Sequence, residues 1–214
     1  MAEIALSKNV VRNSSYAWLW VLFAAWFLVV LLLGSNNLFV PARRMPPLAL
    51  LIASVTPLAA FFLSYSLSSS IREFILSADL KFVTTVQAWR LGGFTFLVLY
   101  SFGYLVGYFA WPAGVGDMLI GVTAPLVLAR MDTPGYTKSN AFIAWNVLGI
   151  LDLVVAVSLG ALGSLQFGSA GVFPNTVMSQ MPMVLIPTFF VPMFLILHSV
   201  ALLQARSADK LSRA

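Results

Sequence analysis

The sequence predicts an all-α protein: a polytopic bundle of six transmembrane helices, formed by residues 1–214 as a single domain. Hydrophobic residues make up 60% of the chain and charged residues only 9%, whereas a soluble protein carries roughly a quarter charged residues. The mean hydropathy of +0.94 points the same way. A third observation, the uneven distribution of lysine and arginine between the loops, sets the orientation of the bundle. Because so few charges cannot cover a water-exposed surface, a soluble fold is excluded.

Six apolar runs are long enough to cross a bilayer, since a helix needs roughly 20 apolar residues to span about 30 Å of hydrocarbon. They cover about residues 17–34, 48–67, 91–111, 113–129, 141–162 and 182–203. The first run is too long for the apolar region of a signal peptide and lacks a small-x-small cleavage motif, so we expect it to be retained. Ser77, followed by Ala78 and Asp79, resembles a helix N-cap with an acid in the first turn. The third helix is therefore expected to begin near Ala78, outside the bilayer.

The basic residues orient this bundle. Six spans place both termini on one side, and with that side inside, ten basic residues are internal and two are external. The internal set is Lys8, Arg12, Arg72, Lys81, Arg90, Arg130, Lys138, Arg206, Lys210 and Arg213, and the external set is Arg43 and Arg44. By the positive-inside rule, the N and C termini are both cytoplasmic. The same rule accounts for the net charge of +5, so we expect no nucleic-acid partner.

Cofactor and catalytic chemistry find little support in the sequence. The chain has no cysteine and a single histidine, His198, which excludes thiolate metal sites and bis-histidine haem within one chain. It contains no paired carboxylates at short spacing, no phosphate-binding glycine loop and no zinc-protease motif. We therefore expect no cofactor, no metal and no catalytic residue, and the sequence leans against an enzyme without deciding the question.

Asp152 is the polar residue that most needs an explanation. It follows the inner start of the fifth run by eleven residues, which places it near the bilayer midplane. Ser101 and Tyr104 are expected at the same level, and their spacing with Tyr108 (i, i+3, i+7) puts all three on one helix face. One interpretation is a neutral carboxyl that only packs the helices through a hydrogen bond. The other is a proton or cation site of a transporter, because an ionisable group in hydrocarbon is a functional candidate by default.

Three further polar residues each carry two interpretations. Asp117 is either an acid favoured by the start of its helix or a residue at the mouth of a pathway that recruits a cation. His198 is expected about 9 Å above the inner end of the sixth helix. It is either a packed histidine with one hydrogen bond or one step of a proton path. Arg90 is expected at the inner interface, where its side chain would reach water, phosphates or an anionic lipid head group.

The outer loop over residues 163–181 has no charged residue and mixes Gly, Ser, Phe and Met. It is either a disordered connector or a lid that lies against the membrane surface.

Four stretches resemble a family of small bacterial multi-pass membrane proteins. They are VQAWRLGG (residues 86–93), WPAGVGDMLIGVTAPLV (111–127), AWNVLGILDLVVAV (144–157) and IPTFFVPMFLILHSVALL (186–203). The resemblance covers roughly residues 82–205 and combines fixed Gly and Pro positions with Arg90, Asp117, Asn146, Asp152 and His198. It implies a location in the bacterial inner membrane and carries over no activity. It adds Asn146 to the candidate site.

Transport of a proton, an ion or a small solute through a polar midplane site is the first functional hypothesis. The alternative is a non-catalytic scaffold or accessory subunit of a membrane complex, and an enzyme acting on a lipid or a quinone is the third. The expected partners are membrane lipids, including anionic head groups, and a second copy of the chain or another membrane subunit.

The charge distribution makes a direct prediction about topology. Reporter fusions at Lys138 and Arg213 should both report the cytoplasm, because each position follows an even number of spans. A periplasmic signal at either position would exclude the six-span arrangement.

Overall fold

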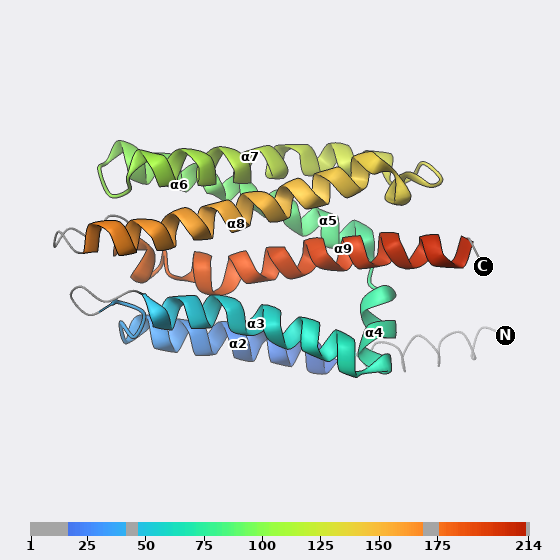
Figure 1. The fold of residues 1–214 in the computed structure, drawn as a ribbon, viewed down its shortest axis with the longest axis horizontal. Helices are drawn as coiled ribbons and strands as arrows, with labels where there is room; N and C mark the ends of the chain where they lie inside the picture. Colours follow the sequence, from blue (N-terminus) through green and yellow to red (C-terminus); the bar gives the residue numbers. More distant parts are fainter. Residues whose placement is uncertain (1–16, 42–46, 169–175, 213–214) are drawn as a thin grey trace.

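The computed structural model describes residues 17–41, 47–168 and 176–212, and all regular secondary structure within these ranges is helical. The helices lie side by side along one axis and form an elongated bundle (Figure 1). The all-α prediction is therefore confirmed. The main helices are α2 (Ala17–Ser35), α3 (Leu48–Leu67), α7 (Gly107–Arg130), α8 (Asn140–Gly168) and α9 (Val191–Ser212). The shorter elements are α4 (Ser69–Leu76), α5 (Leu80–Val86), η1 (Gln87–Gly93), α6 (Phe94–Ser101), η2 (Tyr136–Lys138), η3 (Thr176–Ser179) and η4 (Ile186–Phe190).

Five helical segments are long and apolar enough to cross a membrane. They are Leu48–Leu67, Leu80–Ser101, Gly107–Arg130, Asn140–Leu162 and Ile186–Ser207, and the shorter apolar helix Trp20–Ser35 accompanies them. Helix α9 occupies the centre, because it contacts α3 and α4 on one side and α5 and α8 on the other. Helices α2 and α3 form one edge of the bundle, and α6 and α7 form the opposite edge (Figure 1).

The third and fourth spans have other bounds than the sequence suggested. The expected spans 91–111 and 113–129 are replaced by Leu80–Ser101 and Gly107–Arg130. The turn between them contains Gly103 at φ 77°, a left-handed conformation that glycine adopts without steric cost. The early start expected near Ala78 is confirmed, although the cap is Asp79 rather than Ser77. Its carboxylate accepts hydrogen bonds from the backbone N–H groups of Lys81 at 2.8 Å and Phe82 at 3.4 Å.

The observed bounds of the other four spans differ less from the expected ones. The first two expected spans match α2 and α3 to within a residue. Helix α8 continues beyond residue 162 to Gly168, and the last span begins at Ile186 rather than 182. Of the outer loop, residues 169–175 lie outside the described residues, so the choice between connector and lid is open there. Its second half is packed, because Met178 belongs to the buried apolar cluster around Phe96 and Phe109.

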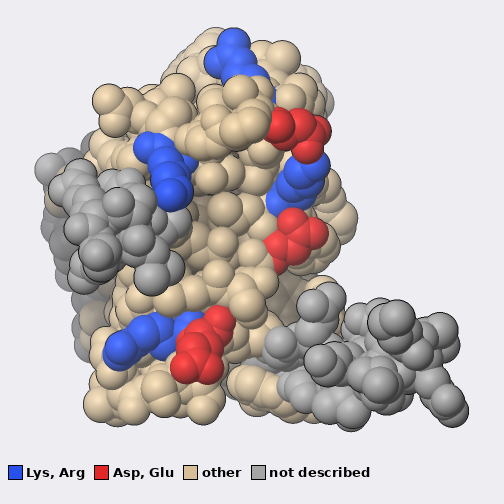
Figure 2. Space-filling model, turned by 90° about the vertical axis from the view of Figure 1, so that its right-hand side faces the viewer, with Lys and Arg blue, Asp and Glu red and all other residues tan. Residues whose placement is uncertain are grey.

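Apart from three residues inside the bundle, the charged side chains that the structure describes gather at one end. Figure 2 views this end and shows basic and acidic groups around its rim. At this end, Gln204 connects α9 to the end of α4 and the turn before α5, because its amide donates to the carbonyls of Ile75 at 3.1 Å and Ala78 at 2.9 Å. The first turn of α2 and the last turn of α9 also lie at this end (Figure 1). The charged side chains of this end are Arg72, Glu73, Asp79, Lys81, Arg130, Asp132, Lys138 and Arg206.

Candidate functional site

Arg90 lies inside the bundle, with 0% of its side chain exposed. This position corrects the expectation that its guanidinium reaches lipid head groups at the inner interface. The reason is the early start of the third span. Counted from Leu80, Arg90 is ten residues and therefore about 15 Å into the helix.

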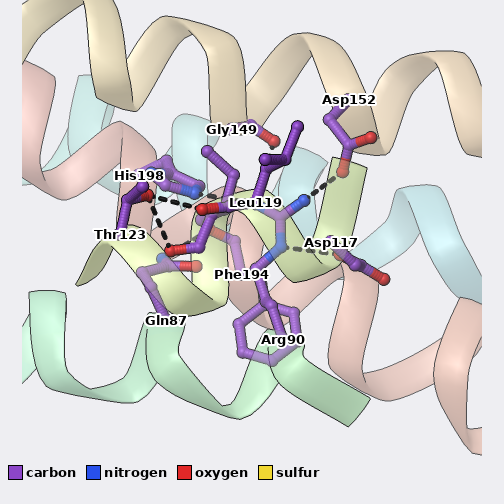
Figure 3. Close-up of polar contacts among 10 residues, drawn as sticks. Gln87, Arg90, Asp117, Leu119, Thr123, Gly149, Asp152, Phe194 and His198 are labelled. Atoms are coloured by element: carbon purple, nitrogen blue, oxygen red, sulfur yellow. Dashed lines mark hydrogen bonds and ion pairs between the residues drawn. The ribbon is translucent and has the colours of Figure 1, made fainter. Parts of the chain in front are cut away.

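The guanidinium is bonded on every edge (Figure 3). Its Nε donates to Asp117 Oδ1 at 2.7 Å, and its Nη2 forms an ion pair with Asp152 Oδ2. Its Nη1 donates to the carbonyl of Gly149 and to His198 Nε2, each at 3.1 Å. We call Arg90, Asp117, Asp152 and His198 the Arg90 cluster. Its members come from η1, α7, α8 and α9, so one side chain connects four segments of the chain.

The protonation of His198 follows from its partners. Arginine has no acceptor, so His198 Nε2 must accept from Arg90, and the ring hydrogen is on Nδ1. Nδ1 donates in turn to Asn146 Oδ1 at 2.9 Å, and the Asn146 amide donates to the carbonyl of Phe142 at 2.9 Å. The indole of Trp145 packs edge-on against the imidazole, with 5.4 Å between the ring centroids. His198 is therefore a neutral imidazole with both nitrogens engaged.

The charges of the cluster do not balance. Asp117 and Asp152 both contact Arg90, and no other basic side chain among the described residues forms an ion pair with either carboxylate. With both carboxyls ionised the cluster has a net charge of −1. Their side chains are 14% and 15% exposed, so neither is sealed from small molecules. A proton or a cation that joins them restores neutrality.

Three glycines let the helices approach closely enough for this network. A Cβ atom on Gly93 would lie 2.3 Å from Asp117 Cβ, and one on Gly149 would lie 2.3 Å from His198 Nε2. On Gly116 it would lie 1.6 Å from Asp152 Oδ1. Real Cβ atoms essentially never come within 3.0 Å of such groups. Each glycine therefore makes the space for one polar side chain of the cluster.

Gln87 is a buried polar residue that the sequence reasoning missed. It is 1% exposed and lies one turn before Arg90. Its amide nitrogen donates to the carbonyl of Phe194 at 3.4 Å, but its Oε1 has no hydrogen-bond partner among the described residues. Thr84, also 1% exposed, lies one turn further toward the charged end. The three-residue spacing of Thr84, Gln87 and Arg90 was visible in the sequence, and it predicts one polar face once the helix is known to start at Leu80.

A cavity of about 80 Å³ reaches the cluster from the opposite end of the bundle. Its walls come from the first turns of α3, residues 153–161 of α8, η3 and η4, with one or two residues each of α6, α7 and α9, and its only charged lining residue is Asp117. The carboxylate thus joins the cavity to the buried guanidinium.

The structure separates the predicted site residues into two groups. Asp117, Asn146, Asp152 and His198 come together around Arg90, whereas Ser101, Tyr104 and Tyr108 do not. Helix α6 ends at Ser101, so these three residues lie at the end of the spans and not at the midplane.

The expected bond between Asp152 and Ser101 or Tyr104 is replaced by the ion pair with Arg90. The Ser101 hydroxyl donates to the Val98 carbonyl at 2.8 Å, and Tyr104 is 62% exposed. Asp117 is ten residues into α7 and not at the start of a helix, because α7 begins at Gly107.

Comparison with known families identifies one family whose matched region includes the whole Arg90 cluster. A family model described as a domain of unknown function (DUF8737) matches residues 46–206, or 161 of the 214 residues. The chain belongs to this family. The matched DUF8737 segment contains the whole Arg90 cluster and begins just before α3, so α2 lies outside it. No curated protein and no solved structure matches the chain.

The close approach at Gly116 predicts a localised packing defect. Gly116→Ala should lower the free energy of unfolding by about 1–3 kcal/mol, the usual cost of overpacking, because the methyl group collides with the Asp152 carboxylate. Thermal unfolding in detergent measures this change.

Gly92→Ala is the matched control, since its Cβ would meet no described atom within 4 Å. That variant should stay within about 0.5 kcal/mol of the parent. Equal stability of the two variants would contradict the close contact between α7 and Asp152.

Proposed function

We propose that this chain is a membrane transport protein that moves a proton, an ion or a small solute through the Arg90 cluster. The observation that carries this proposal is the ratio of two carboxylates to one guanidinium in the middle of the bundle. A purely structural ion pair needs one carboxylate. The second one gives the site a place for an exchangeable proton or cation.

The energetic reason is the environment. A single uncompensated charge within the hydrocarbon region costs several kcal/mol, so the cluster is held neutral by a bound proton or cation. Release of this proton requires another positive charge to replace it or water to reach the carboxylates. Such an exchange is the elementary step of a coupled transporter.

Access from one end supports the same function. The cavity leads from one end of the bundle to Asp117. On the other side of Arg90, Thr84 and Gln87 are buried, and the unpaired Gln87 Oε1 is an acceptor that a bound water molecule can use. One long segment is irregular at this depth, since η1 is a 3₁₀ segment that carries Arg90, and the π turn η4 begins the last span. Interrupted helices near the midplane are typical of transporter sites.

The six-span topology completes the proposal. Helix α2 is the sixth crossing, beside the five long segments. The charged end, where α2 begins and α9 ends, is the cytoplasmic end by the positive-inside rule. The resemblance noted in the sequence favours the inner membrane of a bacterium, with membrane lipids as the surrounding partners.

Replacing one carboxyl tests the exchangeable proton. Asp152→Asn leaves one guanidinium opposite one carboxylate, so the variant should fold, with its unfolding free energy changed by no more than about 1 kcal/mol. The infrared band of a protonated carboxyl, present in the parent protein, should disappear. In proteoliposomes with an internal pH-sensitive dye and an imposed pH gradient, proton flux should fall to the rate of protein-free vesicles. A folded variant with unchanged, still pH-dependent flux would exclude the proton site and leave the scaffold function as the better account.

Replacing both carboxyls should have a far larger effect. Asp117→Asn and Asp152→Asn together leave the guanidinium buried without an anion, and we expect a loss of about 3–5 kcal/mol of stability. Each single variant keeps one ion pair, so the losses should be strongly non-additive. Denaturation in detergent measures all three variants against the parent protein. A double variant whose loss equals the sum of two small losses would contradict the shared guanidinium.

A further inference from the structure

The cavity above Asp117 is built mainly of hydrocarbon. Its walls include Leu50 and Leu51 of α3, Phe96 of α6, Phe109 of α7 and Leu153 of α8. Helix α9 contacts both α3 and α8. The cavity lies between α3 and α8, beside η4. It therefore offers dispersion contacts to an apolar group that enters from this end of the bundle.

The cavity has one charged wall, and this wall is negative. Asp117 lines the cavity, whereas Arg90, its partner, has a side chain that is 0% exposed. A molecule in the cavity therefore meets the carboxylate and not the guanidinium. Because the cluster contains a second carboxylate, Asp152, the negative charge at Asp117 is not fully cancelled.

The chemistry of these walls selects one class of ligand. An anion is repelled by the excess carboxylate. A hard metal cation takes about six or more oxygen ligands, and among the described residues no group of three or more acidic, histidine or cysteine side chains is placed to hold a metal. A neutral apolar molecule leaves the Asp117 carboxylate without a partner of opposite charge. A primary ammonium ion with a short alkyl group satisfies both surfaces, since its N–H groups donate to the carboxylate and its carbon chain packs against the walls.

The volume limits the size of the alkyl group. A cavity of roughly 150 Å³ holds benzene, which has six heavy atoms. The cavity here has a volume of about 80 Å³. It therefore suits about three or four heavy atoms, the size of a propylammonium ion.

We infer that this cavity binds a small alkylammonium ion, with the ammonium group on Asp117 and the alkyl group between α3 and α8. The inference rests on the proposed function and names the substrate class of the same site. The ammonium ion arrives fully protonated and forms an ion pair with a carboxylate. The carboxyl proton that neutralised the cluster leaves to water, so one cation enters for each proton released.

Few other charged or titratable groups surround Asp117. The charged groups that face Asp117 are Arg90 from η1 and Asp152 from α8. His198 from α9 faces Arg90 and is neutral, as its hydrogen bonds require. The exchange therefore involves the two carboxyls and leaves the guanidinium and the imidazole unchanged.

Proton release on ligand addition tests the inference. The full-length protein is placed in nanodiscs of phosphatidylglycerol, a lipid without an ammonium group, in weak buffer with a pH indicator. Propylammonium chloride should release up to one proton per protein, whereas 1-propanol and sodium propionate at the same concentration should release none. Saturation-transfer NMR follows binding of propylammonium directly.

A filled cavity supplies the matched variants. Ala156 lines the cavity, so Ala156→Leu should weaken propylammonium binding by at least about tenfold, since the added carbons occupy the ligand space. Ala59→Leu makes the same change on an exposed face of α3 and should bind as the parent protein does.

The outcomes separate this inference from the proposed function. Absence of proton release in the parent protein, or equal release with 1-propanol, would overturn the alkylammonium site, whether or not Ala156→Leu folds. If the carboxyl infrared band and the proton flux still depend on Asp152 in that case, the proposed proton function stands without this ligand. If Asp152→Asn changes neither, the proposed function fails first.

Discussion

The arrangement of the bundle depends on the burial of one guanidinium. Removing Arg90 from water carries an effective penalty of several kcal/mol, which is recovered only when its donors are all engaged in good geometry. All three guanidinium nitrogens are engaged, through four hydrogen bonds to groups from three other segments: Asp117 of α7, Asp152 and the Gly149 carbonyl of α8, and His198 of α9. These contacts fix the relative heights of the helices. The apolar surfaces around them, which face lipid tails of similar polarity, specify the register far less.

Close approach of the backbones is the second condition that this guanidinium imposes. Gly93, Gly116 and Gly149 each face a polar member of the cluster at a distance where a methyl group would not fit. Small residues at helix contacts are a general means of packing in membranes. Here they have a more specific effect, because each one makes room for a side chain that would otherwise be displaced from the guanidinium. The short 3₁₀ segment η1 carries Arg90 itself and brings Gly93 into the same region.

Much of the fold could be predicted from the sequence, because helix formation and membrane insertion follow from local composition. The first two spans matched the expected bounds to within a residue, and the early start of the third helix was signalled by Asp79. The turn at Gly103 was missed, since the residues around it are as apolar as a span and hydropathy does not distinguish a short turn from a continuing helix.

The candidate site was predicted only in part. Asp117, Asp152 and His198 could be identified because buried ionisable residues are costly in hydrocarbon, and Asn146 was added by the family resemblance. Their common partner could not, since Arg90 was assigned to the interface from bounds that began at residue 91 rather than Leu80. An error of eleven residues in the start of the membrane span amounts to about 16 Å in depth, which is about half a bilayer. Ser101 and Tyr104 were assigned to the midplane by the same error in reverse.

The hydrogen bond between Arg90 and His198 has a consequence for the order of events at this site. While Nη1 of Arg90 donates to Nε2, the lone pair of that nitrogen is occupied, and the imidazole cannot take up a proton. The ring becomes a base only when the guanidinium swings away from it. In the resting arrangement, therefore, His198 cannot act as a base. It can accept a proton only after the Arg90 side chain has moved away. A proton on either carboxylate would be separated from the histidine by the Arg90 side chain alone.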